Sequence, residues 1–544
     1  MMKMVNKYCE GIIVSVIAIL TAFFNLFHVF YWALKTPPHT IFIGITHWYE
    51  DYFFYLSGLT QGAAGAWKLK NLYTLEAIPL GFSWIFNLVL GRIAALISLP
   101  VWTTYDGTIF FLSLVYVLTA FMVLTRIFPH QPGKRLGALV IAITSTHFFA
   151  IEKSALGGVT FVPITYFYAY TAAFNRFGGV AHHVAQNILS VGSLVLLANL
   201  INNLASYPTN RTILLSAGLS LVLSLLFTMS SFYVAVNVGV FCLAVGLMRV
   251  LYGRPIRMKT LAISLGIILV PLMWLGLTQG AILSHPFWQQ VRVWETTRTP
   301  TSLSTFILSM GMITPFLLLG VRRYLRTPSA IRVVGFLYAF VPVILYVTNV
   351  SERVGIPSFR LLQPGAYVVF GAVAMEGMES IARRFKPRNS RAVLVLILIV
   401  YTLLQLPGLV AEIQKRTNEY YLNSHLNFLK ADVYEGLMFL SRQPKNKAVL
   451  AVHTLESFVP VVSGFAVYEG HATITMDYKS KIEKTIAFYY RKIRPEDAKK
   501  LLSTNNIGYV LWEKRFGDAG ILSDYYPFLQ KYYENPALVI FTIQ

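Results

Sequence analysis

Two adjacent carboxylates, Glu50 and Asp51, lie in an aromatic segment near the start of the chain, which reads His-Trp-Tyr-Glu-Asp-Tyr from His47 to Tyr52. A carboxylate in such a segment can remove the proton of an attacking hydroxyl or hold a divalent metal on a phosphate. Asp51 is the first candidate for this role and Glu50 the second, with His47 as a neighbouring substrate contact. The alternative is that both acids stabilise the first turn of a solvated helix, where negative charge is favoured.

Four more acidic residues border apolar segments: Asp106, Glu152, Glu295 and Glu352. Glu152 is the best candidate for a second carboxylate, since ionisable residues at the ends of membrane spans are functional by default. It could equally be the partner of Lys153 or a charge that reaches to the membrane rim. No cofactor is indicated by a motif; if Mg²⁺ or Mn²⁺ takes part, Asp51 and Glu152 are its expected ligands.

Three arginines are candidates for binding a phosphate, because Arg binds phosphate through two parallel hydrogen bonds that Lys cannot form. They are Arg353 and Arg360, within the segment from Ser351 to Arg360, and Arg176. Arg360 is the most suggestive because it lies at the start of an apolar segment, where charge is costly. As charges at the membrane rim, all three would need no special role.

The histidines give weaker signals. His182 and His183 could bind a metal or donate to a phosphate, but neighbours on a helix point about 100° apart, so at least one is expected to be structural. His471 ends a segment of small and polar residues that starts at Ser463, and it could face a site or simply belong to a turn. We find no zinc-protease motif, no Walker A motif, no Rossmann fingerprint and no nucleophile elbow.

The elements that carry these residues are mainly membrane helices. Of the 544 residues, 56% are hydrophobic and only 13% are charged, which is more apolar than a soluble domain allows. Apolar runs long enough to cross a bilayer predict eleven spans, near residues 11–34, 107–125, 136–151, 187–205, 212–229, 232–251, 260–278, 302–320, 331–348, 359–378 and 391–410.

Basic residues alternate between the loops in the way that membrane insertion requires. With the N-terminus in the cytoplasm, the inner loops hold most of the Lys and Arg, and Lys and Arg in short loops resist translocation. The inner set is Lys3, Lys7, Arg126, Lys134, Arg135, Arg211, Arg249, Arg254, Arg257, Lys259, Arg322, Arg323, Arg326, Arg332, Arg383, Arg384, Lys386, Arg388 and Arg391. The net charge of +22 is therefore that of a plasma-membrane protein facing anionic lipid, and a nucleic-acid partner is not indicated.

Two regions are expected outside the bilayer, on the extracytoplasmic side. The first outer loop, 35–105, is long for a connector, and its apolar part, 78–99, is interrupted by polar residues, glycine and proline, as in an interfacial helix. A soluble α/β domain occupies 412–544, after a membrane module of 1–411. It is expected to contain strands at 448–452, 507–511 and 537–543 and helices at 477–490 and 495–502.

Taken together, these features resemble the bacterial and archaeal members of the GT-C glycosyltransferase superfamily. The resemblance rests on Glu50-Asp51, Tyr55, Gln61-Gly62, Gly65, Asn71-Leu72-Tyr73, Tyr468-Glu469-Gly470-His471 and Asn506-Ile507-Gly508-Tyr509-Val510. It implies a mainly α, GT-C-like bundle and a donor of the polyprenyl-phosphate-sugar kind. The Trp-Trp-Asp signature of oligosaccharyltransferases is absent, which argues against transfer to asparagine.

The resemblance also implies an inverting transfer to an extracytoplasmic hydroxyl of a glycan, lipid or protein, with Asp51 as the base. Arg360, together with Arg353 or Arg176, would stabilise the departing phosphate. The alternative is a transporter or flippase of lipid-linked saccharides. Such a protein should carry ionisable residues at mid-membrane depth, whereas those found here gather at the outer ends of the spans.

Overall fold

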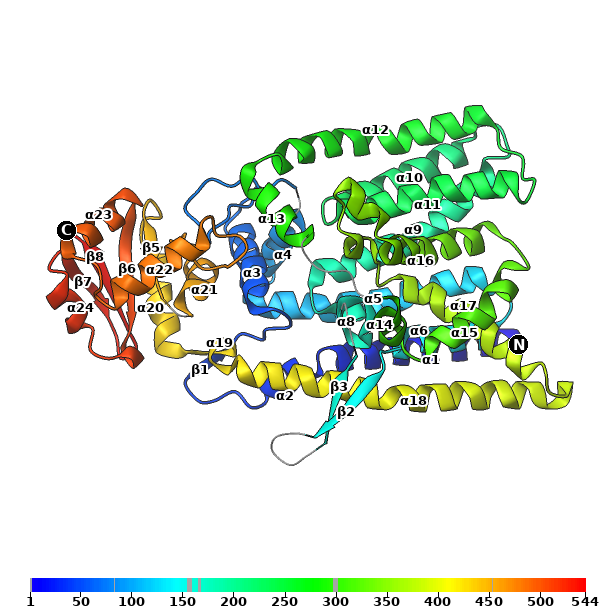
Figure 1. The fold of residues 1–544 in the computed structure, drawn as a ribbon, viewed down its shortest axis with the longest axis horizontal. Helices are drawn as coiled ribbons and strands as arrows, with labels where there is room; N and C mark the ends of the chain where they lie inside the picture. Colours follow the sequence, from blue (N-terminus) through cyan, green and yellow to red (C-terminus); the bar gives the residue numbers. More distant parts are fainter. Residues whose placement is uncertain (1, 83, 154–158, 165–167, 297–301, 453) are drawn as a thin grey trace. The chain divides into compact units, whose positions relative to one another are not determined.

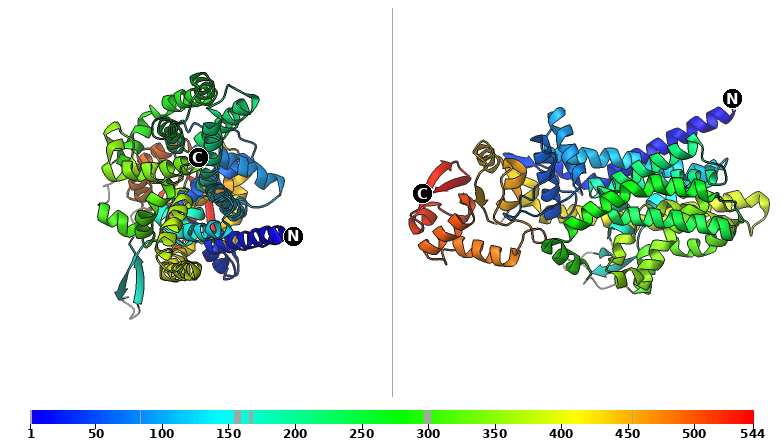
Figure 2. Two further views of the ribbon diagram at one scale, coloured as in Figure 1. Left: turned by 90° about the vertical axis from the view of Figure 1, so that its right-hand side faces the viewer. Right: turned by 90° about the horizontal axis from the view of Figure 1, so that it is seen from above.

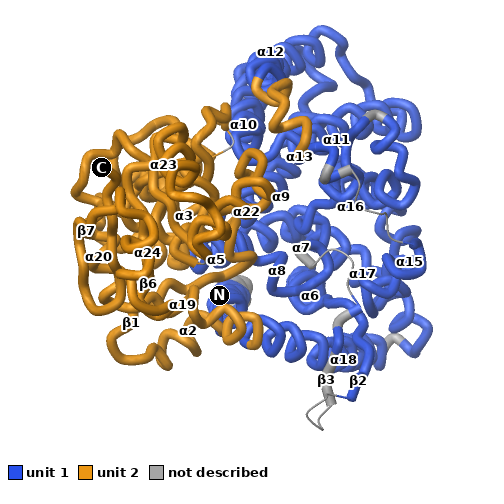
Figure 3. Tube along the Cα trace, turned by 60° about the vertical axis from the view of Figure 1, so that its left-hand side comes forward, with its two compact units in different colours: residues 1–27, 108–281, 292–417 blue, residues 28–107, 282–291, 418–544 orange. Residues whose placement is uncertain are grey.

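The computed structural model describes residues 2–82, 84–153, 159–164, 168–296, 302–452 and 454–544 (Figure 1). The chain forms two compact units, coloured separately in Figure 3. Unit 1 comprises 1–27, 108–281 and 292–417, and unit 2 comprises 28–107, 282–291 and 418–544. The boundary at 417/418 lies near the predicted one at 411/412, but unit 2 also takes in the segment that sequence analysis assigned to the first outer loop.

Unit 1 is almost entirely helical. Its elements, some of which continue into unit 2, are α1 (Met2–Asn25), α5 (Val101–Ile127), α6 (Pro132–Thr144), β2 (Phe149–Lys153), β3 (Val159–Pro163), α7 (Tyr168–Thr171), α8 (Ala173–Gly178), α9 (Ala181–Asn203), α10 (Asn210–Phe227), α11 (Ser231–Val250), α12 (Met258–Leu283), α13 (Pro286–Thr296), α14 (Leu303–Met310), α15 (Ile313–Leu325), α16 (Ala330–Thr348), the 3₁₀ turns η1 (Val350–Val354) and η2 (Ser358–Leu361), α17 (Ala366–Ala382) and α18 (Pro387–Leu422).

Eight helices in the described part of the chain are long and apolar enough to cross a membrane, or nine if α14 and α15, bent by 90°, count as one span. A multi-pass bundle is therefore confirmed, but the predicted number of eleven is not. When α14 and α15 count as one span, two predicted spans are not confirmed. They are 136–151 and 359–378, where α6 has 13 residues and α17 has 17. At a rise of about 1.5 Å per residue they are roughly 20 and 25 Å long, short of a hydrocarbon core of about 30 Å.

The segment predicted as the end of the third span is a hairpin instead. Helix α6 stops at Thr144, and Phe149–Lys153 then pairs antiparallel with Val159–Pro163. An apolar run of this length is compatible with either structure, and its β-branched and aromatic residues pair well across two strands. Glu152 thus lies on an exposed strand and not at the end of a membrane helix.

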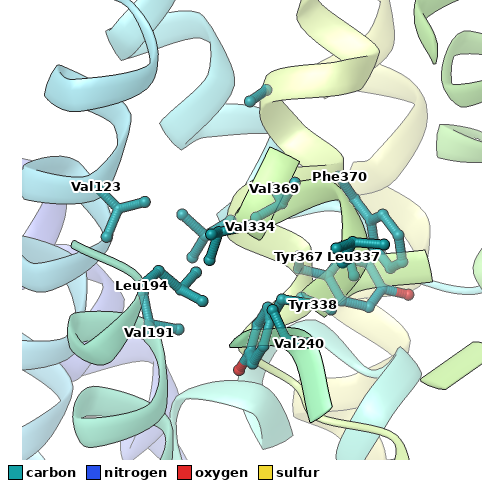
Figure 4. Packing of buried hydrophobic residues seen from close by; sticks show 14 of the residues in the cluster. Val123, Val191, Leu194, Val240, Val334, Leu337, Tyr338, Tyr367, Val369 and Phe370 are labelled. Atoms are coloured by element: carbon teal, nitrogen blue, oxygen red, sulfur yellow. The ribbon is translucent and has the colours of Figure 1, made fainter. Parts of the chain in front are cut away.

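The core of unit 1 lies between helices that run side by side, among them α9, α10, α11 and α16 (Figures 1 and 2). Aliphatic and aromatic side chains from several helices interdigitate there (Figure 4), including Val191, Leu194, Val240, Leu337 and Phe370. Helix α17 is buried at every position from Ala366 to Met378. The one acid in this range, Glu376, forms ion pairs with Lys134 and Arg323. Gly320 of α15 lies directly against the backbone of α17, so that a side chain there would collide with a carbonyl group.

Unit 2 contains helices and the larger sheet of the molecule. Its elements are α2 (Phe27–Ala33), β1 (Thr40–Phe42), α3 (Tyr49–Ala63), α4 (Ile85–Leu96), α19 (Ser424–Asn427), β4 (Phe428–Lys430), α20 (Ala431–Ser441), β5 (Ala448–Leu450), α21 (Leu455–Phe458), the π-helical turn η3 (Val459–Ser463), α22 (Tyr478–Tyr489), α23 (Pro495–Thr504), β6 (Ile507–Glu513), the 3₁₀ turn η4 (Lys514–Phe516), α24 (Gly520–Tyr525), β7 (Leu529–Glu534) and β8 (Leu538–Ile543).

The C-terminal α/β fold is confirmed. Its four strands lie in the order β5-β6-β8-β7, with β5 parallel to β6 and the other pairs antiparallel. The predicted strands and helices match β5, β6, β8, α22 and α23 within a few residues. Strand β7 was missed because it is an edge strand with mostly exposed, polar residues, which lack the alternating pattern of a half-buried strand.

Parts of the first outer loop are built into unit 2. Strand β1 pairs with β4, with Thr40 opposite Lys430 and Phe42 opposite Phe428, and Thr74 forms a bridge with Glu469. The predicted interfacial segment contains α4, a helix of 12 residues. Helix α4 packs closely on α3, where Gly91 faces the carbonyl of Leu59. The rest of the long loop therefore packs around helix α3, which lies within the loop and carries the candidate carboxylates.

Candidate active site

Glu50 and Asp51 lie in the first turn of α3, as the sequence suggested. The helix is anchored by the residues that follow them, since Tyr52, Phe53 and Leu56 are completely buried. The N-cap residue, Trp48, makes no capping bond with its side chain within the described residues, and the two acids supply the negative charge that the helix end favours. This local role does not exclude a chemical one, because the two carboxylates have different surroundings.

Glu50 is held by hydrogen bonds to both of its carboxylate oxygens. The indole N–H of Trp48 donates to Oε2 at 3.0 Å, and the backbone N–H of Ala472 donates to Oε1 at 3.2 Å. This carboxylate therefore ties the start of α3 to the loop 470–476. Such a structural task makes Glu50 the weaker candidate for a base.

Asp51 contacts a histidine from the same loop. Nε2 of His471 lies 3.3 Å from Oδ1 of Asp51. The backbone N–H of Thr473 points at Nδ1 of His471 over 3.2 Å, so Nδ1 is the acceptor and Nε2 carries the proton of the neutral ring. His471 therefore donates to Asp51. Its side chain is 2% exposed, whereas that of Asp51 is 47% exposed, so a fixed donor holds a carboxylate that solvent and substrate can reach.

The loop that presents His471 is fixed by a second set of hydrogen bonds within unit 2. The hydroxyl of Thr475 accepts from the backbone N–H of His471 at 3.1 Å and donates to the carbonyl of Tyr73 at 2.6 Å. The side chain of Asn71 donates to the carbonyl of Ile474 at 2.7 Å and accepts from the N–H of Tyr73 at 3.0 Å. The Asn71-Leu72-Tyr73 segment thus sets the position of the histidine.

Two buried carboxylates lie in the same region. Burial raises the pKa of Glu469 to about 7. Burial, together with the negative charge of Glu469, raises the pKa of Glu456 well above its usual value. Glu76 behaves differently: burial alone would raise its pKa, but hydrogen bonds from Lys481 and Thr74 bring it below the usual value. A protonated Glu469 keeps this region free of an uncompensated buried charge at moderately acidic pH.

The raised pKa of Glu469 predicts a pH-dependent stability. Between pH 4.5 and 7, Glu469 keeps a proton in the folded state that it has lost in the unfolded chain. The contribution of this residue to the free energy of unfolding is therefore largest below pH 4.5 and falls as the pH rises toward 7. The loss from this group is up to about 3 kcal/mol. In thermal unfolding at pH 5 and pH 8, Glu469→Gln should show a smaller drop than the wild type. The exposed Glu483 is the matched control, and an unchanged drop in Glu469→Gln would refute the assignment.

His47 lies among aromatic rings just before α3. Its ring centroid is 5.5 Å from those of Tyr52 and Tyr55 and 6.1 Å from that of Tyr105. Its Nδ1 is 3.1 Å from the hydroxyl of Thr46. Asp106, another acid noted in the sequence, lies in the same unit, 3.4 Å from the hydroxyl of Tyr52. His47 therefore packs against the aromatic residues around the start of α3.

The remaining candidates belong to unit 1. Arg176 is 1% exposed, and its guanidinium donates to the carbonyls of Thr171, Ala142 and Ser145 while stacking 3.7 Å above the ring of Tyr367. Its donors are thus largely committed to holding α6 and the α7–α8 region. This geometry supports a structural role more than the phosphate-binding role expected from the sequence.

Arg360 is better placed to bind an anion. It forms an ion pair with Glu295, and its side chain is 41% exposed. Among the described residues, its buried Nε has no hydrogen-bond partner. Arg353 is exposed in the neighbouring 3₁₀ turn, and Glu352 in that turn accepts a hydrogen bond from Ser358 at 2.7 Å. Of the three arginines, Arg360 therefore combines an anchored position with a partly exposed side chain, whereas the guanidinium of Arg176 is buried against carbonyl groups.

His182 is buried at the start of α9, and its ring lies edge-on to that of His183 at 4.5 Å. Over the described residues, no three His, Cys, Asp or Glu side chains are grouped so that they could hold a metal ion. The two ligands expected for a metal, Asp51 and Glu152, belong to different units. A role for a metal ion stays a prediction, and the reaction proposed below is described through side chains alone.

The sequence matches no protein-family model and no curated protein. The structure, by contrast, is similar to solved membrane enzymes. The oligosaccharyltransferase of Archaeoglobus fulgidus aligns with a TM-score of 0.53 at 11% identity, over 98% of this chain and 74% of that one. ArnT from Cupriavidus metallidurans, bound to undecaprenyl phosphate, aligns with a TM-score of 0.51 at 11% identity, over 98% and 97%. The arabinofuranosyltransferase AftD from Mycobacteria gives 0.51 at 13%, over 98% of this chain and 39% of its own length.

The chain shares its fold with these solved glycosyltransferases. The expected resemblance is thus confirmed for the architecture, and the match to ArnT covers nearly the whole of both chains. Identities of 11–13% carry the fold and not the residue roles. The assignment of roles therefore rests on the geometry of Asp51 and His471.

Sequence reasoning missed several residues around that geometry. Thr473 and Thr475 orient His471, yet threonines in a loop give no signal of their own. Glu456 lies in an apolar stretch, Leu-Glu-Ser-Phe-Val, where a lone acid could have been noticed as a buried charge. Glu469 lies in the segment that ends at His471, and the sequence gives it no signal separate from that segment.

Proposed function

We propose that the chain is a membrane glycosyltransferase that moves a sugar from a polyprenyl-phosphate donor to a hydroxyl acceptor on the extracytoplasmic side, with inversion. The observation that carries this proposal is the half-exposed carboxylate of Asp51, whose Oδ1 is held by His471. The GT-C fold supports the class of reaction. Among proteins of similar fold, ArnT was solved with undecaprenyl phosphate and the archaeal oligosaccharyltransferase with a dolichol-phosphate and an inhibitory peptide.

The proposed reaction needs one base and one leaving group. Asp51 takes the proton of the acceptor hydroxyl, and the oxygen attacks the anomeric carbon of the donor sugar from the face opposite the phosphate. The bond between the anomeric carbon and the phosphate oxygen breaks, and its electron pair leaves with the lipid phosphate. Because phosphate is a good leaving group, the reaction requires no general acid.

The topology is part of the proposal. A cytoplasmic N-terminus and an extracytoplasmic unit 2 follow from the distribution of Lys and Arg between the loops. An outward-facing Asp51 suits a carrier lipid whose sugar has already been moved across the membrane. The acceptor is then a glycan, lipid or protein at the outer face.

The function is tested by incubating the purified full-length protein with polyprenyl-phosphate sugars and hydroxyl acceptors in proteoliposomes. We expect radiolabelled sugar to appear on the acceptor. Movement of the labelled lipid between leaflets without any sugar transfer would instead support the flippase alternative and remove the proposal.

Arg360 is proposed to bind the donor phosphate, which leads to a prediction about the donor KM. Arg360→Gln should raise the KM for the polyprenyl-phosphate sugar by about tenfold or more, since hydrogen bonds to charged groups contribute roughly 1.5–3 kcal/mol each. Arg360→Lys should recover only part of the loss, because Lys cannot form two parallel bonds. The acceptor KM should stay close to that of the wild type. A wild-type donor KM in Arg360→Gln would exclude Arg360 from donor binding.

A further inference from the structure

A cavity of about 620 Å³ lies at one end of the helix bundle of unit 1, separate from the residues proposed for catalysis. Its wall is formed by the C-terminal ends of α5 and α9, the segment after α11 and the start of α16. The residues that matter for its chemistry are Arg126, Arg254, Arg332, Asn199, Asn202 and Ser329.

The lining of this cavity carries three arginines and no acidic residue. Arg332 is 8% exposed and fixed in the wall, where it donates to the carbonyl of Tyr324 at 3.0 Å and to the hydroxyl of Thr327 at 2.8 Å. Arg126 and Arg254 are exposed, and within the described residues neither guanidinium takes part in an ion pair or a hydrogen bond. Two cations with uncommitted donors therefore line the cavity. The third, Arg332, forms an ion pair at 3.6 Å with Glu376, which is not among the lining residues.

The start of α16 adds backbone donors to these charges. Ser329 occupies the N-cap position, but its side chain makes no capping bond. The first helical bond found here runs from the N–H of Val333 to the carbonyl of Ser329, so the N–H groups of Ala330, Ile331 and Arg332 have no backbone acceptor among the described residues. Free N–H groups at the start of a helix of 19 residues favour an anion, and they lie in the same wall as the arginines.

The distribution of basic residues places all the segments with these arginines on the cytoplasmic side of the membrane. Arg126, Arg254 and Arg332 come from three different loops that the distribution of Lys and Arg assigns to the cytoplasm. Basic pockets between membrane helices on that side are typical sites for phosphorylated head groups. We propose that this cavity binds the phosphate of an anion, either the head group of an anionic phospholipid or a soluble phosphate compound. The site is additional to the proposed transfer reaction and does not depend on it.

The test compares binding to the full-length protein in a non-ionic detergent. The lipid probes are phosphatidylglycerol and phosphatidylcholine, measured by native mass spectrometry, and the soluble probe is inorganic pyrophosphate, measured by calorimetry. The test variant is Arg126→Gln/Arg254→Gln, which removes two exposed charges and leaves the buried Arg332 in place. Arg211→Gln is the control, because Arg211 is an exposed arginine of another inner loop that does not line the cavity. Arg126→Lys/Arg254→Lys tests whether charge alone suffices.

We expect the wild type to bind phosphatidylglycerol more tightly than phosphatidylcholine, the double Gln variant to lose about tenfold or more in affinity, and Arg211→Gln to bind like the wild type. The double Lys variant should retain part of the binding. The same pattern with pyrophosphate, and no preference between the two lipids, would identify a soluble anion as the occupant. The proposal is overturned if the double Gln variant and Arg211→Gln respond alike, or if the wild type binds neither anionic probe.

Discussion

Asp51→Asn should lower the rate of sugar transfer by about 10²- to 10⁴-fold, the range by which a positioned base accelerates a reaction. Asparagine has nearly the same shape and can still accept a hydrogen bond from Nε2 of His471, but it cannot take up the acceptor proton. The change should appear in kcat, with little effect on the donor KM. Single-turnover transfer from a labelled polyprenyl-phosphate sugar measures it directly.

Glu50→Gln is the matched control for this experiment. Its side chain has the same length, and Oε1 can still accept from the N–H of Ala472, while the bond from Trp48 is weakened. We expect a loss well below that of Asp51→Asn, accompanied by a modest loss of thermal stability. If Asp51→Asn turned over like the wild type while Glu50→Gln did not, Glu50 would be the base.

His471→Asn and His471→Gln should separate the two contacts of the histidine ring. An asparagine places its oxygen near the position of Nδ1, so it keeps the bond from Thr473 but offers Asp51 no donor. A glutamine places its amide nitrogen near Nε2, so it keeps the bond to Asp51. We expect about a tenfold lower kcat for His471→Asn, because a hydrogen bond to a charged group contributes roughly 1.5–3 kcal/mol, and a much smaller loss for His471→Gln.

The pH–rate profile distinguishes positioning of Asp51 from simple support of the loop. A donor favours the charged form of a carboxylate, so without it the acid limb of the profile should move to higher pH in His471→Asn and stay in place in His471→Gln. Equal losses in the two variants with unchanged profiles would show that His471 only supports the loop.

The sequence was informative where local patterns decide the structure. Acids before a buried aromatic run marked the start of α3, and short apolar runs between turn residues marked β5, β6 and β8. It was less informative where a side chain's role depends on distant backbone. Arg176 reads as a charge beside two glycines, but in the fold it meets carbonyls more than thirty positions upstream, at Ala142 and Ser145.

The same limit applies to the site itself. Asp51 and His471 were both candidates, yet nothing local links residues that are 420 positions apart. The tautomer of His471 depends on Thr473, which no pattern singles out. The predicted number of spans was too high for a related reason. Helix α6 ends before a hairpin and α17 begins after a 3₁₀ turn, and tertiary packing defines both boundaries.

The pairing of β1 with β4 has a consequence for biogenesis. Strand β1 is made near the start of synthesis, whereas β4, and then His471, follow only after the last membrane helix. Contacts between such distant segments form late and slowly. A nascent or truncated chain that ends before residue 428 thus contains β1 without its partner strand and Asp51 without the histidine that donates to it. We therefore expect the full rate of the proposed transfer only from a chain whose last segment has been made and has paired with the first.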